Sequence, residues 1–363
     1  MEFTHNEFLF KLSSSSRPRE AMVEVTRRCN FSCIYCFRNE LPMEYLASDM
    51  SRGTYELFLE DAVKTGIVKL AFTGWGEPLI HPFITDFIEM AKKHGLEILL
   101  QTNGALLGEY SWELVELDLD ELYVSIDVGV GMRIGGAIEL ILEGVDLVND
   151  AKRKLGRDKP VIRFQFTLNK YNVRGLKQLL NMAAAHGVRE VIVSDTIPSN
   201  PAVASASCFN SSECISIIEE YKTYIINTAF TEYTLLRLPN LELKTERHCP
   251  FMENNAFYLT VEGDVAPCLF YAHKWHPIIG GVEREITPVR YGNIHEKSIM
   301  DIWRSQDYTR FRFNVKYHQL PSCLDCPLVE GCALTRSNEA DCWGNKPTCS
   351  FCPYARGISF CPL

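Results

Sequence analysis

The sequence predicts an α/β fold with a parallel sheet, open or barrel-like, followed by a small cysteine-rich region. Three observations predict this fold class. Six short β-branched runs alternate with longer amphipathic stretches between residues 21 and 195. Polar and glycine-rich segments follow nearly every one of those runs. Nine of the 14 cysteines fall between residue 249 and the end.

Each element rests on its own local pattern. The amphipathic stretches predict helices at 82–94, 136–155 and 173–186. Gly95 and Gly187 stand where the caps of two helix C-termini are expected. The expected strands are 21–26, 67–73, 96–102, 121–127, 160–168 and 188–194. In such folds the chemistry collects at the C-terminal ends of the strands.

The rest of the chain divides by composition. Residues 197–210 are typical of a linker or long loop, and a helix is expected over about 211–229. Residues 256–270 indicate a hairpin with Gly263 and Asp264 in the turn, and 297–305 indicate a short helix. The segment 129–135, "GVGMRIG", has the wrong glycine spacing for a dinucleotide site and is expected to be a loop.

Composition excludes several classes of protein. The 363 residues carry a net charge of −9, with 46% hydrophobic and 23% charged residues, so no nucleic-acid partner is expected. No run of about 18 apolar residues suggests a membrane span, and the first 20 residues lack the order of a signal peptide. We therefore expect a cytoplasmic protein whose cysteines are thiols or metal ligands. The simplest interpretation of Cys208 and Cys214 is as buried small hydrophobic side chains, and the sequence does not assign them a role.

Three cysteines, Cys29, Cys33 and Cys36, stand within the eight residues "CNFSCIYC" after the first strand. A structural zinc site uses four ligands, usually as two separated pairs, and no other cysteine or histidine lies in this loop. A disulfide is disfavoured here because the cytoplasm keeps thiols reduced. A cubane iron–sulfur cluster held by three thiolates keeps one iron open, which is the mark of a reactive site.

The other strand ends carry "TGWGEPL", "QTNG", "SID" and "SDT". Glycines allow close approach of the backbone to a ligand, and a carboxylate such as Glu77 pairs with an ammonium group. The alternative for Gly74–Pro78 is a plain turn between a strand and a helix. Agreement among independent segments predicts one site on one rim of the sheet.

These residues resemble a family. Cys-x3-Cys-x2-Cys after the first strand is the signature of the radical S-adenosylmethionine (radical SAM) enzymes, and "TGWGEP" is similar to their Gly-Gly-Glu-Pro motif with Trp75 inserted. The resemblance implies a partial (β/α)6 TIM-like barrel. It also implies that Cys29, Cys33 and Cys36 are the catalytic cluster ligands. The SAM-binding residues that it implies are Tyr35 near the adenine, Gly74, Gly76, Glu77 and Pro78 at the methionine amino group, Thr102 and Asn103 of the third-strand motif, Ser125 and Asp127 at the ribose, and Asn172 and Val193 at the adenosine.

The C-terminal cysteines form a second constellation. Cys249, then Gly263-x4-Cys268, then Cys-x2-Cys-x5-Cys at 323–332 resemble the SPASM extension, which implies two auxiliary [4Fe–4S] clusters. The usual next cysteine, three residues on, is absent. Cys323, Cys326 and Cys332 are expected to share one cluster, and Cys249 and Cys268 the other. The metal ligands left without an assignment are Cys342, Cys349, Cys352 and Cys361. Zinc ribbons are the alternative.

Four segments follow from this division. We expect an N-terminal extension at 1–19, the barrel at 20–200, a linker with a helix at 201–248, and the auxiliary-cluster domain at 249–363. About 20 residues precede the first strand, which is too few for a fused peptide-recognition domain.

The resemblance implies an activity. A one-electron reductant such as ferredoxin or flavodoxin reduces the open [4Fe–4S] cluster, S-adenosylmethionine is cleaved, and a 5′-deoxyadenosyl radical takes hydrogen from a substrate. The "GWGEP" variant and the cysteine-rich tail look like the maturases of tungsten-pterin aldehyde oxidoreductases. A pterin cofactor or a partner oxidoreductase is then the expected substrate. Alternatives are a SPASM enzyme that modifies peptides, one of haem biosynthesis, or a non-catalytic iron–sulfur scaffold or electron carrier.

Overall fold

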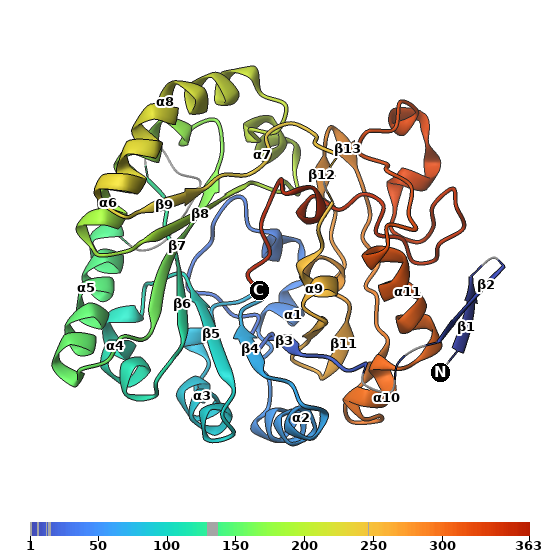
Figure 1. Cartoon of the computed structure of the whole chain (residues 1–363), viewed down its shortest axis with the longest axis horizontal. Helices are drawn as coiled ribbons and strands as arrows, with labels where there is room; N and C mark the ends of the chain where they lie inside the picture. Colours follow the sequence, from blue (N-terminus) through green and yellow to red (C-terminus); the bar gives the residue numbers. More distant parts are fainter. Residues whose placement is uncertain (1, 6, 12, 14–15, 129–136, 246) are drawn as a thin grey trace.

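The computed structural model describes residues 2–5, 7–11, 13, 16–128, 137–245 and 247–363. Its main sheet has ten strands in the order β14-β11-β10-β3-β4-β5-β6-β7-β8-β9. Figure 1 shows the sheet curving into an incomplete barrel, with helices on the outer side. The strands are β3 Glu20–Val23, β4 Lys69–Phe72, β5 Glu97–Thr102, β6 Glu121–Ser125, β7 Val161–Leu168, β8 Glu190–Asp195, β9 Leu235–Arg237, β10 Ala256–Leu259, β11 Asp264–Ala266 and β14 Gly292–Asn293.

The predicted partial (β/α)6 barrel is confirmed. Strands β3 to β8 match the six expected runs and pair in parallel, each with the next in the chain. The helices are α1 Met43–Leu46, α2 Arg52–Thr65, α3 Ile84–Lys93, α4 Leu107–Glu116, α5 Ile138–Leu155, α6 Leu176–Ala185, α7 Pro201–Ala206, α8 Ser212–Thr231, α9 Pro250–Glu253, α10 Ile299–Trp303 and α11 Gln306–Lys316. Gly95 and Gly187 have positive φ after α3 and α6, as their helix-cap positions predict.

Two small hairpins lie outside the main sheet. Strands β1 Glu2–His5 and β2 Phe8–Lys11 pair antiparallel within the N-terminal extension. Strands β12 Ile278–Ile279 and β13 Val282–Glu283 pair antiparallel in the C-terminal region. The predicted loop 129–135 lies outside the described residues, and the predicted linker 197–210 contains α7.

The C-terminal region extends the same sheet, which the sequence did not predict. The expected hairpin is present as β10 and β11, and β10 also pairs in parallel with β3, from Glu20 opposite Ala256 to Val23 opposite Leu259. Strand β3 is therefore an interior strand, buried on both sides by its neighbours. Barrel and cysteine-rich region are consequently joined by backbone hydrogen bonds.

The barrel interior is layered. At the N-terminal ends of the strands, Lys69 Nζ lies 2.8 Å from Glu121 Oε1, and Arg163 forms ion pairs with both Glu121 and Glu190. The next layer is apolar, made of Ala71, Leu99, Tyr123 and Ile192. Above that layer the strand ends are polar. Such layers are the ordinary way in which a parallel barrel fills its interior.

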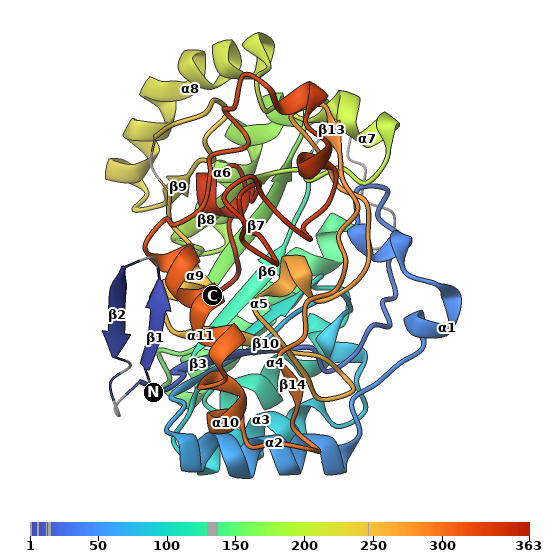
Figure 2. The ribbon, with the colours of Figure 1, turned by 90° about the vertical axis from the view of Figure 1, so that its right-hand side faces the viewer.

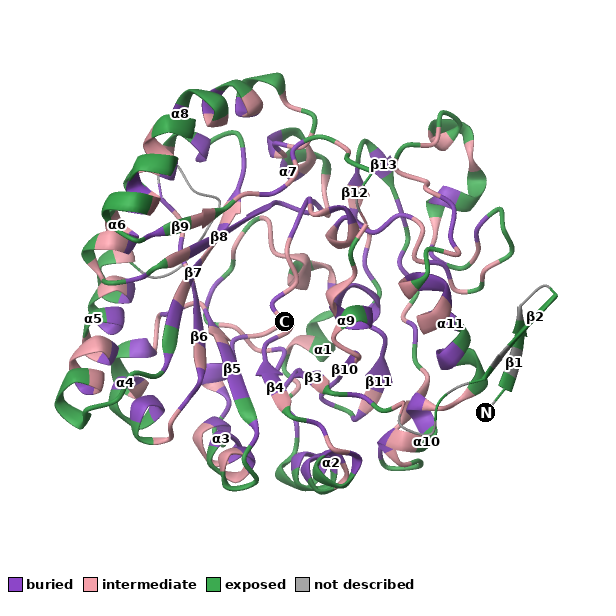
Figure 3. Cartoon of the chain, viewed as in Figure 1, coloured by how far each residue is buried: buried purple, intermediate pink, exposed green. Residues whose placement is uncertain are grey.

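The C-terminal tail enters the open side of this barrel. Phe360 and Leu363 pack against the apolar layer, and Figures 1 and 2 show the chain end inside the curve of the sheet. The Phe360 amide donates to Ser194 Oγ at 3.0 Å, and the Ser359 hydroxyl donates to the Asp195 carbonyl at 3.0 Å. The tail thus forms part of the wall of the space above the layer. Figure 3 shows that the strands are mostly buried and that exposure lies on the outer helices.

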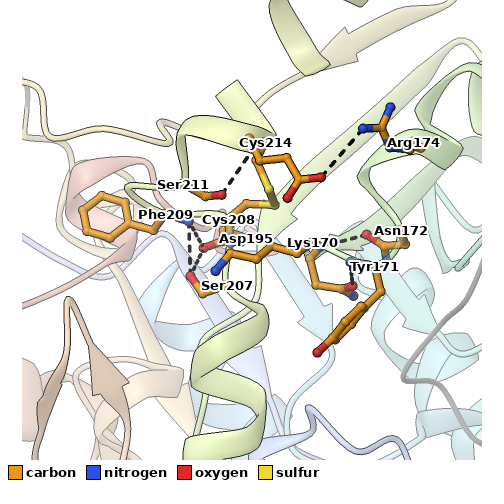
Figure 4. The surroundings of a disulfide bond; sticks show 12 residues. Lys170, Tyr171, Asn172, Arg174, Asp195, Ser207, Cys208, Phe209, Ser211 and Cys214 are labelled. Carbon is orange, nitrogen blue, oxygen red and sulfur yellow. Dashed lines mark hydrogen bonds and ion pairs between the residues drawn. A yellow bond between two sulfur atoms is a disulfide. The ribbon is translucent and has the colours of Figure 1, made fainter. Parts of the chain in front are cut away.

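The expected burial of Cys208 and Cys214 is confirmed, but the general expectation that the cysteines are thiols or metal ligands is wrong for this pair. Both are fully buried, but they form a disulfide between the start of α8 and the turn before it. Asp195 supports that turn by accepting from the Ser207 hydroxyl at 2.6 Å and from the Cys208 amide at 2.9 Å (Figure 4). Six residues separate the two cysteines in the sequence, so short-range chain geometry brings them together. Burial raises the pKa of Asp195 to about 6.

Candidate active site

The three N-terminal cysteines lie on one loop at the C-terminal end of β3. The Cys36 amide donates to the Cys33 carbonyl at 3.1 Å, which turns the loop back on itself. The Phe31 amide donates to Cys29 Sγ at 3.4 Å, and Asn103 Nδ2 donates to the same sulfur at 3.7 Å. Donors of this kind stabilise a sulfur that carries negative charge.

The environment of these sulfurs fits an iron–sulfur cluster. Burial raises the pKa of the Cys36 thiol to about 12, and its neighbours Cys33 and Cys29 contribute to that rise. The three sulfurs therefore influence one another. Among the described residues, no three potential ligands converge on a single metal ion. A cubane does not require such convergence, because each thiolate binds a different iron.

Glu77 connects two strand ends. Its Oε1 accepts from Thr102 Oγ1 at 2.7 Å and from the Leu79 amide at 3.1 Å. Its Oε2 accepts from the Asn103 amide at 2.6 Å. The carboxylate is nearly buried, at 3% exposure, and Pro78 begins the short helix Pro78–Ile80 that supplies the Leu79 donor. The motifs after β4 and β5 are therefore one hydrogen-bonded unit.

Asn103 ties that unit to the cysteine loop. Its Nδ2 donates to Asn30 Oδ1 at 2.7 Å, besides its contact with Cys29. The Glu77 amide donates to the Arg28 carbonyl at 2.8 Å, directly before Cys29. The structure thus brings together the first three predicted motifs.

The two glycines of "TGWGEP" allow close packing. A Cβ at Gly76 would lie 2.2 Å from the Thr26 carbonyl oxygen and 2.7 Å from that of Arg28, both of them backbone atoms. A Cβ at Gly74, which has a φ of +154°, would lie 2.7 Å from Tyr258 Oη. Only glycine fits these positions without movement of the backbone or of a buried side chain.

Trp75 has a role that the sequence did not reveal. Its side chain is 2% exposed, and Nε1 donates to the Leu269 carbonyl at 3.3 Å, next to Cys268. Its ring meets Trp275 edge to face at 5.8 Å and lies 4.4 Å from the ring of Phe37. The inserted residue therefore packs the barrel motif against the C-terminal region. The sequence carries no local signal for this contact, because Trp75 is one of five tryptophans distributed over both regions.

Tyr35 and Asp127, predicted separately for adenine and ribose, meet directly. Tyr35 Oη donates to Asp127 Oδ2 at 2.9 Å, which joins the cysteine loop to the end of β6. Ser125 lies two residues earlier, on the wall of a cavity at the mouth of the barrel.

That cavity adjoins the predicted cofactor site. Cys36, Tyr35 and Gly74 line one side, and Phe360 and Pro362 of the C-terminal tail line another. Uncharged polar side chains cover much of the remainder. Thr73 Oγ1 donates to Gln101 Oε1 at 2.6 Å, and Gln101 Nε2 donates to Gln165 Oε1 at 2.5 Å. A hydrogen-bonded row thus runs across three strands.

Asn172 and Val193 are not brought to this cavity. Asn172 uses its side chain in the turn after β7, where Oδ1 accepts from the Asn169 amide at 2.8 Å and Nδ2 donates to the Thr167 carbonyl at 2.9 Å. Val193 is fully buried in the main core, on the opposite face of β8 from Ile192. The side chains of Asn172 and Val193 therefore stabilise the fold and do not line the cavity.

The C-terminal cysteines fall into two neighbourhoods. Burial raises the pKa of the Cys268 thiol, and the nearby Cys352 and Cys249 raise it further. Cys361 is affected in the same way by Cys352, Cys249 and Cys268, and Cys349 contacts Cys352. A cavity of about 440 Å³ is lined by Cys249, Cys349 and Cys352. The structure therefore adds three of the unassigned cysteines to the predicted pair Cys249 and Cys268.

The second neighbourhood surrounds Cys323. Burial raises the pKa of this thiol, and Cys342 contributes to that rise. The Cys326 amide donates to the Cys323 carbonyl at 3.3 Å, and the turn that follows leads to Cys332. The Cys323 amide donates to the Ser350 carbonyl at 3.2 Å, so the two neighbourhoods adjoin. Cys342 thus stands beside the predicted group of three.

No helix in the described part of the chain is long and apolar enough to cross a membrane.

Comparisons with known proteins agree with the cysteine loop and the fold. Residues 23–157 match the model of the radical SAM superfamily, and residues 249–327 match SPASM, an iron–sulfur cluster-binding domain. The chain belongs to the radical SAM superfamily, as an enzyme with a C-terminal SPASM domain.

Within that class, one relative matches along nearly its whole length. The chain is 34% identical over 349 residues to the tungsten-containing aldehyde ferredoxin oxidoreductase cofactor-modifying protein of Pyrococcus furiosus, covering 94% of this chain and 96% of the relative. It is 28% identical over 186 residues to a PqqA peptide cyclase of Gluconobacter oxydans, covering 50% of each. The fold is similar to that of Streptococcus suis SuiB bound to S-adenosylmethionine, with a TM-score of 0.62 at 15% identity, covering 87% of this chain and 72% of that one.

Proposed function

We propose that this enzyme cleaves S-adenosylmethionine reductively and uses the resulting radical to modify a cofactor or protein, with the tungsten-pterin cofactor of an aldehyde oxidoreductase as substrate. The observation that carries the proposal is the hydrogen-bonded unit of the cysteine loop, Glu77 and Asn103 beside a cavity. The full-length similarity to a cofactor-modifying protein supports the choice of substrate.

In this proposal, Cys29, Cys33 and Cys36 hold a [4Fe–4S] cluster through three of its irons. A cluster held there would supply one electron to the sulfonium of S-adenosylmethionine, whose S–C5′ bond would break to leave methionine and a 5′-deoxyadenosyl radical that takes hydrogen from the substrate. Asn103 donates to a cluster-bound sulfur and fixes the loop. Glu77 is the carboxylate for the methionine ammonium group, already oriented by three donors.

The remaining predicted contacts divide by position. Tyr35, Ser125 and Asp127 are proposed to contact the adenosyl group, because they lie between the cysteine loop and the cavity. Gly74 and Gly76 allow the backbone after β4 to lie close to the segment that follows β3. Pro78 and Thr102 fix the position of Glu77. Any contact from Val193 would involve its backbone, since its side chain is in the core.

Two auxiliary [4Fe–4S] clusters are part of the proposal. We assign Cys249, Cys268, Cys352 and Cys361 to the one nearer the cavity, and Cys323, Cys326, Cys332 and Cys342 to the other. Cys349, which contacts Cys352 in the first neighbourhood, is left without a cluster in this assignment. We keep 249–363 as the auxiliary-cluster region, 20–200 as the barrel, and 201–248 as the linker. The proposal includes a one-electron reductant such as ferredoxin or flavodoxin and a cytoplasmic location.

The cavity lining supports a substrate rich in hydrogen-bonding groups. The amides of Gln101 and Gln165 and the hydroxyls of Thr73 and Ser194 offer donors and acceptors without net charge. A pterin ring presents such groups along its edge. A peptide backbone does so as well, and the partial similarity to a peptide cyclase keeps peptide modification as the second candidate.

The test uses reconstituted, full-length protein with dithionite and S-adenosylmethionine. We expect 5′-deoxyadenosine from the wild type and at least a hundredfold less from Cys33→Ala, which should keep its C-terminal iron. A Cys214→Ser variant is the matched control and should retain the activity. Absence of 5′-deoxyadenosine from the wild type under strong reduction would overturn the proposal.

A further inference from the structure

A buried arginine lies between the two groups of C-terminal cysteines. Arg284, which follows β13, is 1% exposed. Its Nε donates to the Thr335 carbonyl at 2.6 Å and its Nη2 to the Ser337 carbonyl. Its Nη1 has no hydrogen-bond partner among the described residues. Within the same part of the chain, no carboxylate forms an ion pair with it.

The surroundings of Arg284 come from both cysteine groups. Its guanidinium stacks over the ring of Phe351 at 4.6 Å, and Phe351 stands between Cys349 and Cys352 in the sequence. Thr335 and Ser337, which accept its two hydrogen bonds, belong to the segment between Cys332 and Cys342. Arg284 therefore touches the loops of both groups.

The electrostatic neighbours agree with this placement. Burial lowers the pKa of Arg284, while Tyr271, Cys323, Cys349 and Cys352 act in the opposite direction. Cys323 belongs to one group, and Cys352 to the other. Tyr271 donates its hydroxyl hydrogen to the Thr348 carbonyl at 2.7 Å.

A guanidinium charge in such a place needs a counter-charge. Removing a cation from water without a partner of opposite sign is strongly unfavourable, and arginine does not escape by losing its proton. Carbonyl oxygens and neutral thiols satisfy only part of this requirement. A [4Fe–4S] cluster with four thiolates carries a net negative charge, which its reduction by one electron increases.

We propose that Arg284 is a shared counter-cation of the two auxiliary iron–sulfur clusters and stabilises their reduced forms, which raises both reduction potentials. This inference rests on the auxiliary clusters of the proposed function. The step is a transfer of one electron from a low-potential reductant to a cluster, in which no bond forms or breaks. Each cluster becomes more negative by one charge, so a nearby fixed cation favours the reduced state.

The experiment isolates the auxiliary clusters in the full chain. Cys29, Cys33 and Cys36 are replaced together by alanine in a parent protein, which is reconstituted with iron and sulfide. Potentials are measured by dithionite titration followed by electron paramagnetic resonance. In this parent, Arg284→Gln should lower the ratio of reduced to oxidised cluster about tenfold at a fixed ambient potential, a shift of about −59 mV.

Arg312→Gln is the matched control. Arg312 is partly buried, has a buried Nε without a hydrogen-bond partner and no carboxylate partner among the described residues, and stacks on Trp303 at 3.6 Å. Its electrostatic neighbours are Tyr308 and Tyr291 rather than cysteines. The control should keep the parent's potentials. An Arg284→Gln protein with the potentials of Arg312→Gln would overturn the inference.

Loss of iron is also decisive. If Arg284→Gln does not retain its iron, Arg284→Lys is compared with it. Iron retained by the lysine variant shows that the charge is needed and supports the inference, whereas iron lost from both shows a purely structural arginine and overturns it. A parent protein without C-terminal iron would instead contradict the proposed auxiliary clusters themselves.

Discussion

Replacement of Gly76 by alanine should disconnect the cofactor motif from the cysteine loop. The new Cβ would lie 2.2 Å from the Thr26 carbonyl oxygen and 2.7 Å from that of Arg28. Both obstacles are backbone atoms directly before Cys29, so no side chain can rotate to make room. Either the Gly76 segment or the cysteine loop must move.

The magnitude follows from a comparison with a second glycine. Overpacking in a close-packed region costs about 1–3 kcal/mol and sometimes more, and Gly76 should lie at the upper end, at about 3 kcal/mol. Gly95 has a φ of +75° but nothing within 4 Å of an added Cβ. Gly95→Ala should therefore cost only the left-handed conformation, about 1–2 kcal/mol.

Two assays check this reasoning on reconstituted protein. Thermal unfolding should give a larger decrease in midpoint for Gly76→Ala than for Gly95→Ala. Iron analysis should show the loss of one cluster from Gly76→Ala alone, because the movement affects the loop of Cys29. A Gly76→Ala protein with full iron, and with a midpoint equal to that of Gly95→Ala, would refute the argument.

Three further predictions concern other parts of the molecule. Trp75→Phe should lose about 1 kcal/mol of stability, through the hydrogen bond to the Leu269 carbonyl, and Trp75→Ala about 3–5 kcal/mol, both measured by denaturant unfolding; a Trp75→Phe protein as stable as the wild type would contradict the hydrogen bond to Leu269 as a separate contribution. Cys208→Ser with Cys214→Ser should lower stability by about 2 kcal/mol, and mass spectrometry without reductant should find the bridge in the wild type; two free thiols there would exclude it. The folded pKa of Asp195, about 6, lies above the ordinary aspartate value of 3.8, so the folded state binds this proton more tightly and the contribution of Asp195 to stability falls as pH rises from about 4 to 6. The stability of the wild type minus that of Asp195→Asn should accordingly decrease across this window, by roughly 3 kcal/mol, and a difference independent of pH would contradict the raised pKa.

The sequence predicted those parts of the fold whose signals are local. Six strands and three of the barrel helices could be placed because apolar periodicity and glycine caps act over a few residues, whereas α2 and α4 were not placed. The cysteine loop and Glu77 were found for a similar reason, since strand ends of a parallel sheet meet at one rim. The parallel pairing of β10 with β3 carries no local mark and was missed.

The side-chain details of the site also escaped prediction where they depend on distant partners. Trp75 was seen only as an insertion, because its partners Leu269 and Trp275 lie about 200 residues away in the sequence. The short spacing of Cys208 and Cys214 was visible in the sequence. No disulfide was predicted between them, because a cytoplasmic protein is expected to keep its thiols reduced. Arg284 had no motif at all, and its significance comes only from burial among cysteines.

The pairing of β10 with β3 has a consequence for folding during synthesis on the ribosome. Glu20 of β3 can pair with Ala256 of β10 only after Ala256 has been synthesised. At ordinary rates of translation this takes on the order of tens of seconds. During that time the apolar strand Ala21–Met22–Val23 has a bare edge, and bare apolar edges recruit other chains into aggregates. Chaperone protection of the nascent barrel, and slow rather than fast expression, should therefore favour a high yield of folded protein.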